Sequence, residues 1–203
     1  MTASRNDLVQ AATADVLTAL ARTGLLLQQD KHALNVVTLV TGETLRTSWW
    51  SHPKAQLIFA VLSRLDDHAD VLPSKLLGGK VTFVHRSLWP ALLAVASPDE
   101  NTAEPWQTAG LSTPARRLLE SINEAEHPIR HSGAVVKLLE SRLLVHAHEI
   151  HTESGKHEIV LQPWSMWAKA ARVKPLRSVA AAKQQLEEAA QAIGAAASAL
   201  PWR

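Results

Sequence analysis

The sequence predicts an α+β fold, and three observations carry that prediction. Stretches with apolar residues at helical spacing alternate with short runs rich in β-branched and aromatic residues. The chain has 203 residues and a hydrophobic content of 46%, which is enough to bury a sizeable core. A segment rich in Pro and acidic residues, 97–110, shows neither helical nor strand periodicity and separates two halves. The predicted regions are residues 1–100, 111–177 and 178–203.

Composition excludes several classes of protein. The chain contains no cysteine, which rules out disulfides, thiolate catalysis, Cys-ligated zinc and iron–sulfur clusters. No apolar run is long enough to span a membrane. Asp7 and Asp15 lie where an export signal needs a basic start and an apolar core. We therefore expect a cytoplasmic protein without a membrane partner.

The formal net charge of +2 is unevenly distributed along the chain. Residues 111–177 carry ten Lys or Arg against seven Asp or Glu, whereas residues 1–110 carry nine against ten. This middle region also holds six of the ten histidines. The asymmetry mildly favours an anionic partner, although it is smaller than in dedicated basic nucleic-acid-binding domains.

The first half begins with a predicted helix in the stretch "NDLVQAATADVLTALARTGLLLQQD". Asn6 or Asp7 starts this helix, and Gly24 stops or kinks it. Apolar residues recur at helical spacing and predict its buried side: Leu8, Ala12, Val16 and Leu20. Two β-rich runs follow, residues 36–40 and 44–50, and the Gly42 turn between them is typical of a hairpin.

A second helix is predicted after the Trp pair, with Ser51 as its N-cap and Pro53 in its first turn. Its inward stripe consists of Ala55, Ile58, Leu62 and Leu65. The dipeptide Gly78-Gly79 predicts a turn before a short strand, residues 81–85, and an apolar helix then starts near Pro90. The stretch "LLGGKVTF" lacks the residues of a phosphate-binding loop at both ends, which favours an ordinary turn.

The second half has a different order of elements. Ser112 or Thr113 caps a helix with Pro114 in its first turn, and Ser132-Gly133 opens another helix. Two strands then flank Ser154-Gly155. Over residues 111–167 this order of helix, helix and hairpin resembles the winged-helix superfamily. Such domains have three helices before the hairpin, whereas "EHPIRHSG" leaves room for at most one turn of the middle helix.

The winged-helix resemblance implies a non-enzymatic nucleic-acid-binding or regulatory module. The basic residues on or beside its helices and hairpin tip would contact phosphates: Arg116, Arg117, Arg130, Lys137 and Lys156. Glu140 and the glutamates of the hairpin oppose such contacts. A winged helix used for protein assembly or homodimerisation is therefore an open alternative.

The Trp-rich first half resembles a bacterial protein family, on the stretches "TSWWSHPKAQLIFAVLSRL" and "GGKVTFVHRSLWPALLAVA", and the resemblance implies no activity. Its cationic and indole side chains leave an enzyme or a binder of anionic ligands as a third alternative. The candidate pocket residues are Arg46, Trp49, Trp50, His52, His85, Arg86 and Trp89. In a second interpretation, Trp49 and Trp89 are core anchors. Neither a nucleophile elbow nor a serine with a neighbouring base is present, so an enzyme is the less favoured class.

Four histidines lie within one stretch of a dozen residues in the predicted hairpin: His146, His148, His151 and His157. Alternation along a strand directs His146 and His148 to one face and His151 to the other. Three imidazoles therefore do not converge as a zinc site requires. We expect polar histidines on a solvent-facing hairpin, with neither a metal nor another cofactor.

The C-terminal region predicts a single helix over residues 178–200. Aliphatic residues recur every seven positions, and alanines lie between them, which is typical of a closely packed helix pair. The expected partner is the first helix, residues 7–21, of the same chain or of a second copy. A homodimer through this helix is therefore an open possibility.

Overall fold

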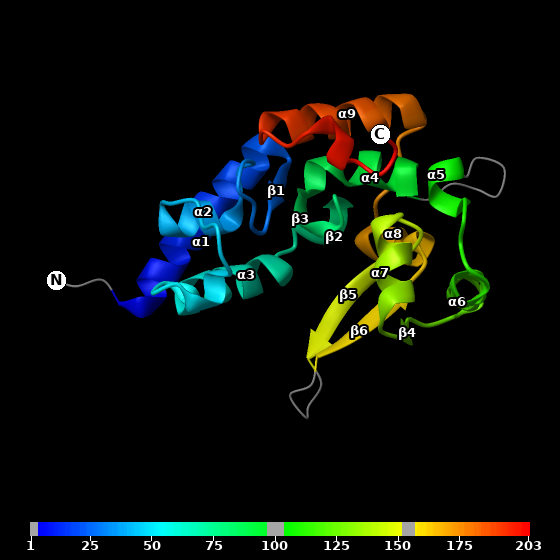
Figure 1. Cartoon of the computed structure of the whole chain (residues 1–203), viewed down its shortest axis with the longest axis horizontal. Coiled ribbons are helices and arrows are strands. Elements are labelled where there is room, and N and C mark those ends of the chain that lie inside the picture. The colour runs from blue at the N-terminus through cyan, green and yellow to red at the C-terminus, as the bar shows by residue number, and fades with distance from the viewer. Residues whose placement is uncertain (1–3, 97–103, 152–156) are drawn as a thin grey trace.

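The computed structural model describes residues 4–96, 104–151 and 157–203, and it confirms the α+β class (Figure 1). The chain forms two units, each containing a three-stranded antiparallel sheet. The first sheet has the order β1 (Leu25–Leu27), β3 (Lys80–His85), β2 (Val71–Leu77), and the second has the order β4 (Ile129–Arg130), β6 (His157–Gln162), β5 (His146–His151). In each unit the last strand lies in the middle. The two sheets therefore share one topology.

The first helix, α1 (Arg5–Thr23), ends at Gly24 as predicted but begins earlier than predicted, with Ser4 and not Asn6 or Asp7 as its N-cap. Ser4 and Asp7 form a capping box, and Gly24 ends the helix in the left-handed conformation at φ 76°. The buried face includes Val9 and Leu20, while Leu8, expected inside, is 51% exposed. The buried stripe is therefore displaced by one residue at the start of the helix.

The predicted hairpin over residues 36–50 is wrong. Residues Val36–Thr41 form a short helix, α2, because the Asn35 side chain accepts a 2.9 Å hydrogen bond from the Thr38 N–H and caps it. Helical spacing buries Val36, Val37 and Val40 on one side. The strand that precedes β2 and β3 in the chain is instead β1 (Leu25–Leu27), which pairs with β3.

Helix α3 (Ala55–Asp66) packs with the predicted inward stripe and also buries Val61. It begins later than predicted, since Ser51 belongs to a 3-10 turn, Trp49–Ser51, and the N-cap residue is Lys54. Strand β2 (Val71–Leu77) was not predicted, and it pairs with β3 (Lys80–His85). Gly78 and Gly79 both adopt positive φ, which suits the tight turn between these strands.

Helix α4 (Trp89–Ala96) is buried at every residue except Pro90. It packs against α9 (Val179–Ala192), which places α4 between the sheet side of the unit and the C-terminal helix. Two parts of the prediction for α9 are wrong. The helix ends near Gly194, which has φ 75°, and does not continue to residue 200. Its main partner is α4 and not α1. Its small residues Ala182 and Ala189 are buried, as a close helix pair requires.

The second unit contains the predicted helices and hairpin. The predicted helices are α6 (Thr113–Glu124) and α7 (Ala134–Ser141), and the predicted hairpin consists of β5 (His146–His151) and β6 (His157–Gln162). Strand β4 (Ile129–Arg130) and the helices α5 (Pro105–Thr108) and α8 (Trp164–Ala171) were not predicted, and α5 falls in the segment 97–110, which was expected to contain no helix. Helix α8 packs against the core of the first unit. Ser112 caps α6 through the Ala115 N–H, and strand β4 occupies the place of a middle helix. A separate core lies between α6, α7 and the hairpin.

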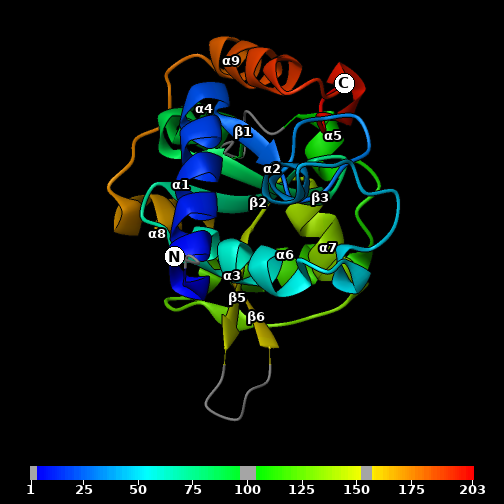
Figure 2. The ribbon, with the colours of Figure 1, turned by 90° about the vertical axis from the view of Figure 1, so that its left-hand side faces the viewer.

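The two units contact each other through α7 and β5, which lie against β2, and through α8, which lies against α4. Leu143, at the end of α7, is fully buried in the core of the first unit. Figures 1 and 2 show α9 along the upper side of the molecule and the β5–β6 hairpin extending from the lower side. Among the described residues, no helix is both long and apolar enough to cross a membrane.

Candidate ligand and nucleic-acid surfaces

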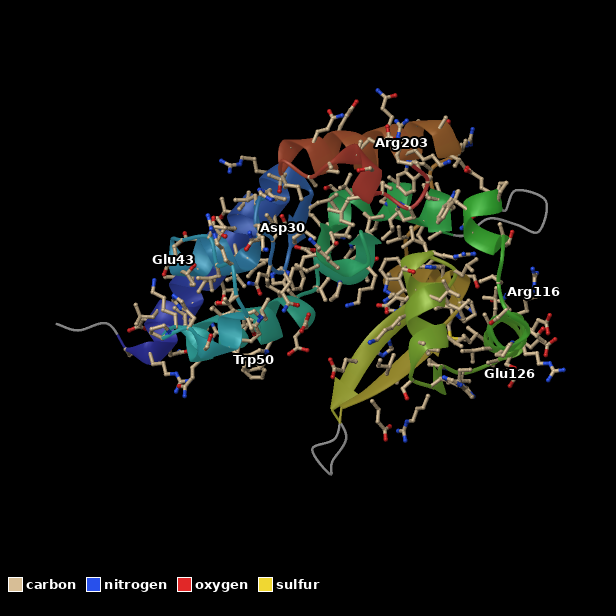
Figure 3. The ribbon with its side chains drawn as sticks, in the orientation of Figure 1. Asp30, Glu43, Trp50, Arg116, Glu126 and Arg203 are labelled. Atoms are coloured by element: carbon tan, nitrogen blue, oxygen red, sulfur yellow. The ribbon has the colours of Figure 1, made fainter. Side chains whose placement is uncertain are left out.

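The basic residues predicted to contact nucleic acid lie on α6, β4 and α7. Arg116 and Arg117 are exposed on α6, in the region marked by Arg116 and Glu126 in Figure 3. Arg130 forms a 3.0 Å ion pair from its Nε to Glu158 Oε2, and Lys137 is exposed on α7. Lys156 lies outside the described residues.

Acidic residues interrupt this basic surface. Glu120 follows Arg116 by four positions on α6, so the two side chains are neighbours on the exposed helix face, and Glu124 follows in turn. On α7, burial raises the pKa of Glu140, and the nearby Lys75 ammonium of β2 offsets this only in part. The second unit therefore presents mixed charges, and one side of α7 faces the first unit.

His146 is buried, which corrects the prediction of a solvent-facing histidine. Its Nδ1 lies 3.1 Å from Gln162 Nε2, and its ring lies 5.3 Å from Trp164 and 5.7 Å from Trp167, measured between centroids. Burial, with a smaller contribution from His148, lowers the pKa of His146 to about 3. A neutral imidazole thus joins an aromatic cluster where the hairpin meets α8.

His146 and His148 share one face of β5, as alternation predicts, with ring centroids 5.5 Å apart. The side chains of His151 and His157 lie outside the described part of the structure. Within that part, no group of three or more His, Asp or Glu side chains converges in a way that would hold a metal ion.

The Trp-rich candidate pocket separates into a core part and a surface part. Trp49 and Trp89 are buried, and Trp89 Nε1 donates to the Val84 carbonyl at 3.1 Å. The remaining members have local partners or remain exposed. His52 lies 3.0 Å from Glu43, Arg86 pairs with Asp70 at 2.8 Å, His85 Nδ1 lies 2.9 Å from Ser87 Oγ, and Trp50 is 65% exposed. These seven side chains therefore do not line one shared pocket.

Arg46 of that set lines a hollow, and the other residues that line this hollow were not predicted. The hollow has a volume of about 540 Å³ and is lined by Lys31, His32, Thr44 and Arg46. An adjoining hollow of about 440 Å³ shares three of these residues and extends to Lys80. We call Lys31, His32, Thr44, Arg46 and Lys80 the cationic hollow.

A hydrogen-bond network around Asp30 shapes one wall of the cationic hollow. The Asp30 carboxylate accepts from the N–H groups of His32 and Ala33 at 2.9 and 3.0 Å, and from Lys80 Nζ at 2.6 Å. Burial alone raises the pKa of Asp30, but these donors together hold it well below its usual range. Gln29 Nε2 donates to the Thr47 carbonyl at 2.7 Å and links this loop to the one that carries Arg46.

The outer side of α3 forms a second distinct surface, which we call the α3 face and define as Trp50, Gln56 and Phe59. Phe59 is 48% exposed and Gln56 is also exposed. The Trp50 ring stacks on Trp49 at 4.0 Å and lies 6.0 Å from the Phe59 ring. Figure 3 shows Trp50 below α3, pointing away from the ribbon.

The helical pattern of the sequence alone could have indicated the α3 face. Phe59 falls outside the inward stripe of Ile58, Leu62 and Leu65, about 100° around the helix from Ile58, so an aromatic residue lies at the edge of the buried face and is half exposed. No protein-family model, curated protein or solved structure matches the chain. These comparisons therefore assign it to no family.

Proposed function

We propose that this chain is a nucleic-acid-binding protein built from two winged-helix units, and that the first unit makes the principal contact through the α3 face. The order of elements supports the assignment of both units. The first unit has helix, strand, two helices and a hairpin, with the strand order β1-β3-β2. The second unit repeats this order with the middle helix missing, and its strand order is β4-β6-β5.

The exposed α3 face is the observation for which we assign the principal nucleic-acid contact to the first unit. In helix-turn-helix proteins the reading helix must be free to enter the major groove. Helix α3 occupies that position and exposes Gln56, whose amide can pair with adenine in two hydrogen bonds. In contrast, α7 of the second unit lies against β2.

The aromatic residues of the α3 face favour single-stranded or distorted nucleic acid over regular duplex. Trp50 and Phe59 present exposed rings close together, and exposed rings provide stacking platforms for unpaired bases. The first half of the sequence carries no net positive charge, which predicts a modest affinity with a shallow dependence on salt. Base stacking would then supply much of the binding energy.

Protein assembly is the second candidate, and the same rings favour it. Exposed aromatic residues are enriched in protein interfaces as well as in nucleic-acid sites. Sedimentation velocity distinguishes the two functions, because a self-assembling α3 face would produce a dimer that Trp50→Ala dissociates. A monomer at all concentrations that still binds oligonucleotides supports the nucleic-acid function.

Fluorescence anisotropy with single-stranded and duplex oligonucleotides at low salt tests the proposal. Trp50→Ala should weaken single-strand binding by about tenfold, since stacking one base on an aromatic side chain contributes about 1 to 3 kcal/mol. Leu8→Ala is the matched control, because Leu8 is a comparably exposed apolar residue of the same unit. Lys137→Glu probes α7 of the second unit.

The results separate the alternatives. A loss with Trp50→Ala and unchanged binding with Leu8→Ala and Lys137→Glu supports the α3 face. A loss confined to Lys137→Glu assigns binding to the second unit. Absence of binding at tens of micromolar protein ends the nucleic-acid proposal and leaves protein assembly as the better account.

A further inference from the structure

We infer that the cationic hollow is a binding site for the phosphoryl group of a small polar ligand or of a nucleic-acid backbone. Its volume of about 540 Å³ falls in the range of pockets that hold small molecules. The inference is independent of the α3 face, because none of Trp50, Gln56 and Phe59 lines either hollow.

The charges of the hollow are unbalanced. Asp30 is the single carboxylate among the lining residues, and it already accepts hydrogen bonds from two backbone N–H groups and Lys80. In the described part of the chain, neither Lys31 nor Arg46 forms an ion pair. Two cations at one concave surface repel each other, and a bound anion would relieve that repulsion.

A phosphoryl group fits these donors better than a carboxylate does. Arg46 offers a planar fork of N–H donors and Lys31 a mobile ammonium, and together they can engage several terminal oxygens of one phosphate. Thr44 lines the first hollow, and Ser48 lines the adjoining one. Their hydroxyl groups are further potential donors at the same place.

The adjoining hollow indicates the character of the rest of the ligand. It is lined by Gln29, Thr47 and Ser48, and Leu45 is its one aliphatic residue. This lining suits a sugar or another hydroxylated group better than a lipid tail. We therefore expect a phosphate ester with a polar body, of which a sugar phosphate and the backbone of a nucleic acid are two sources.

The walls of the hollow are held in place by contacts within the protein. Asn35 Nδ2 donates to the carbonyls of Asp30 and Ala33 at 3.0 and 2.9 Å and fixes the first loop. The Gln29–Thr47 hydrogen bond joins the second loop to it. A site that is already ordered loses little conformational entropy when a ligand binds.

Titration of the full chain with ribose 5-phosphate, followed by amide chemical shifts in NMR, tests the inference. Saturable shifts in the wild-type protein should concentrate at residues 29–48. Lys31→Ala/Arg46→Ala should weaken binding at least tenfold, because each charge-assisted hydrogen bond contributes about a tenfold effect or more. Ribose without phosphate should not bind.

The matched control is Lys169→Ala/Lys174→Ala, which removes the same charge from exposed positions outside the hollow. Binding that weakens equally in both double variants, or wild-type shifts scattered over the surface, would overturn the inference. No saturable shift with ribose 5-phosphate or inorganic phosphate at millimolar concentration would also overturn it. Wild-type shift mapping keeps the test decisive if the double variant folds poorly.

Competition distinguishes the two sources of phosphate. Displacement of ribose 5-phosphate by a short oligonucleotide assigns the hollow to a nucleic-acid backbone and links it to the α3 face. Retained sugar-phosphate binding without any oligonucleotide binding supports the phosphate site and ends the proposed nucleic-acid function. The failures of the two proposals are therefore distinguishable.

Discussion

The two units share a sheet topology but differ in what covers their surfaces. In the first unit, the C-terminal segment lies at the hairpin turn, where the Gly78 N–H donates to the Ala199 carbonyl at 2.7 Å, while the α3 face remains uncovered. In the second unit the hairpin extends away from the body and α7 lies against β2 (Figure 1). Contacts between the units, and not topology, determine which helix can meet a partner.

The distribution of charge differs in the same way. The second unit carries more basic residues, yet Arg130 is paired with Glu158, and the two arginines of α6 are followed by two glutamates on the same helix. The first unit has no excess of positive charge, but Lys31 and Arg46 line one hollow. Net charge along a sequence is therefore a poor guide to where an anion binds, since pairing decides which charges remain available.

Truncation after Ser178 is expected to have the largest effect, because it should destabilise the first unit through α4. It removes Leu186, Ile193 and Leu200, all buried in the core of that unit. Burial of each such side chain contributes roughly 1.5 to 3 kcal/mol, so the free energy of unfolding should decrease by about 5 kcal/mol or more. Thermal unfolding measures this loss, and Val179→Ala, at a partly exposed position of α9, should leave the melting temperature almost unchanged.

A lower pH should destabilise the protein through His146, which packs against the tryptophans of α8. The folded-state pKa is about 3 and the ordinary value is 6.5, so the unfolded chain binds more protons in this range. The contribution of His146 to the free energy of unfolding is therefore fully present above about pH 6.5 and is lost as the pH decreases toward 3. At pH 5 the expected loss is about 2 kcal/mol, since each pKa unit corresponds to 1.36 kcal/mol.

Urea unfolding at pH 7.5 and pH 5 measures this dependence. His146→Phe keeps an aromatic ring in the cluster and removes the titrating group, so its stability should change less between the two pH values. An equal loss in the variant and the wild type would show that other groups cause the pH dependence.

Helix caps provide the smallest and most local comparison of the units. Ser4→Ala removes the cap of α1 and Ser112→Ala removes the cap of α6, and each should cost about 1 kcal/mol. Amide hydrogen exchange then reports where protection is lost. Loss confined to the altered unit indicates that the two units open separately, whereas equal loss in both indicates that Leu143 and α7 couple them into one cooperative structure.

Local sequence determined one end of several helices and much of the faces that they bury. Ser112, Gly24 and Gly133 lie at helix ends in the positions that their chemistry favours, and Ile58, Leu62 and Leu65 point inward at helical spacing. Such signals act over a few residues, so they can be read without knowledge of the rest of the chain. The order of helices and the hairpin in the second unit followed from them.

Tertiary structure decided the features that depend on residues far apart in the chain. The Val-rich run of α2 favours a strand locally, yet burial of its valines in the core of the first unit favours the helix that Asn35 caps. His146 is buried because Trp164 and Trp167 of α8 cover it, which alternation along β5 alone does not reveal. The partner of α9 was likewise set by the apolar surface of α4.

The candidate sites divide in the same manner. The composition of the sequence indicated an affinity for anions, and Arg46 was named among the residues that could provide it. Lys31 and Arg46 lie at one hollow where two loops on either side of α2 meet, and the Gln29–Thr47 hydrogen bond links these loops. A single sequence determines the short-range preferences of its residues, whereas a binding surface forms where distant segments meet, and that meeting is fixed by the packing of the whole chain.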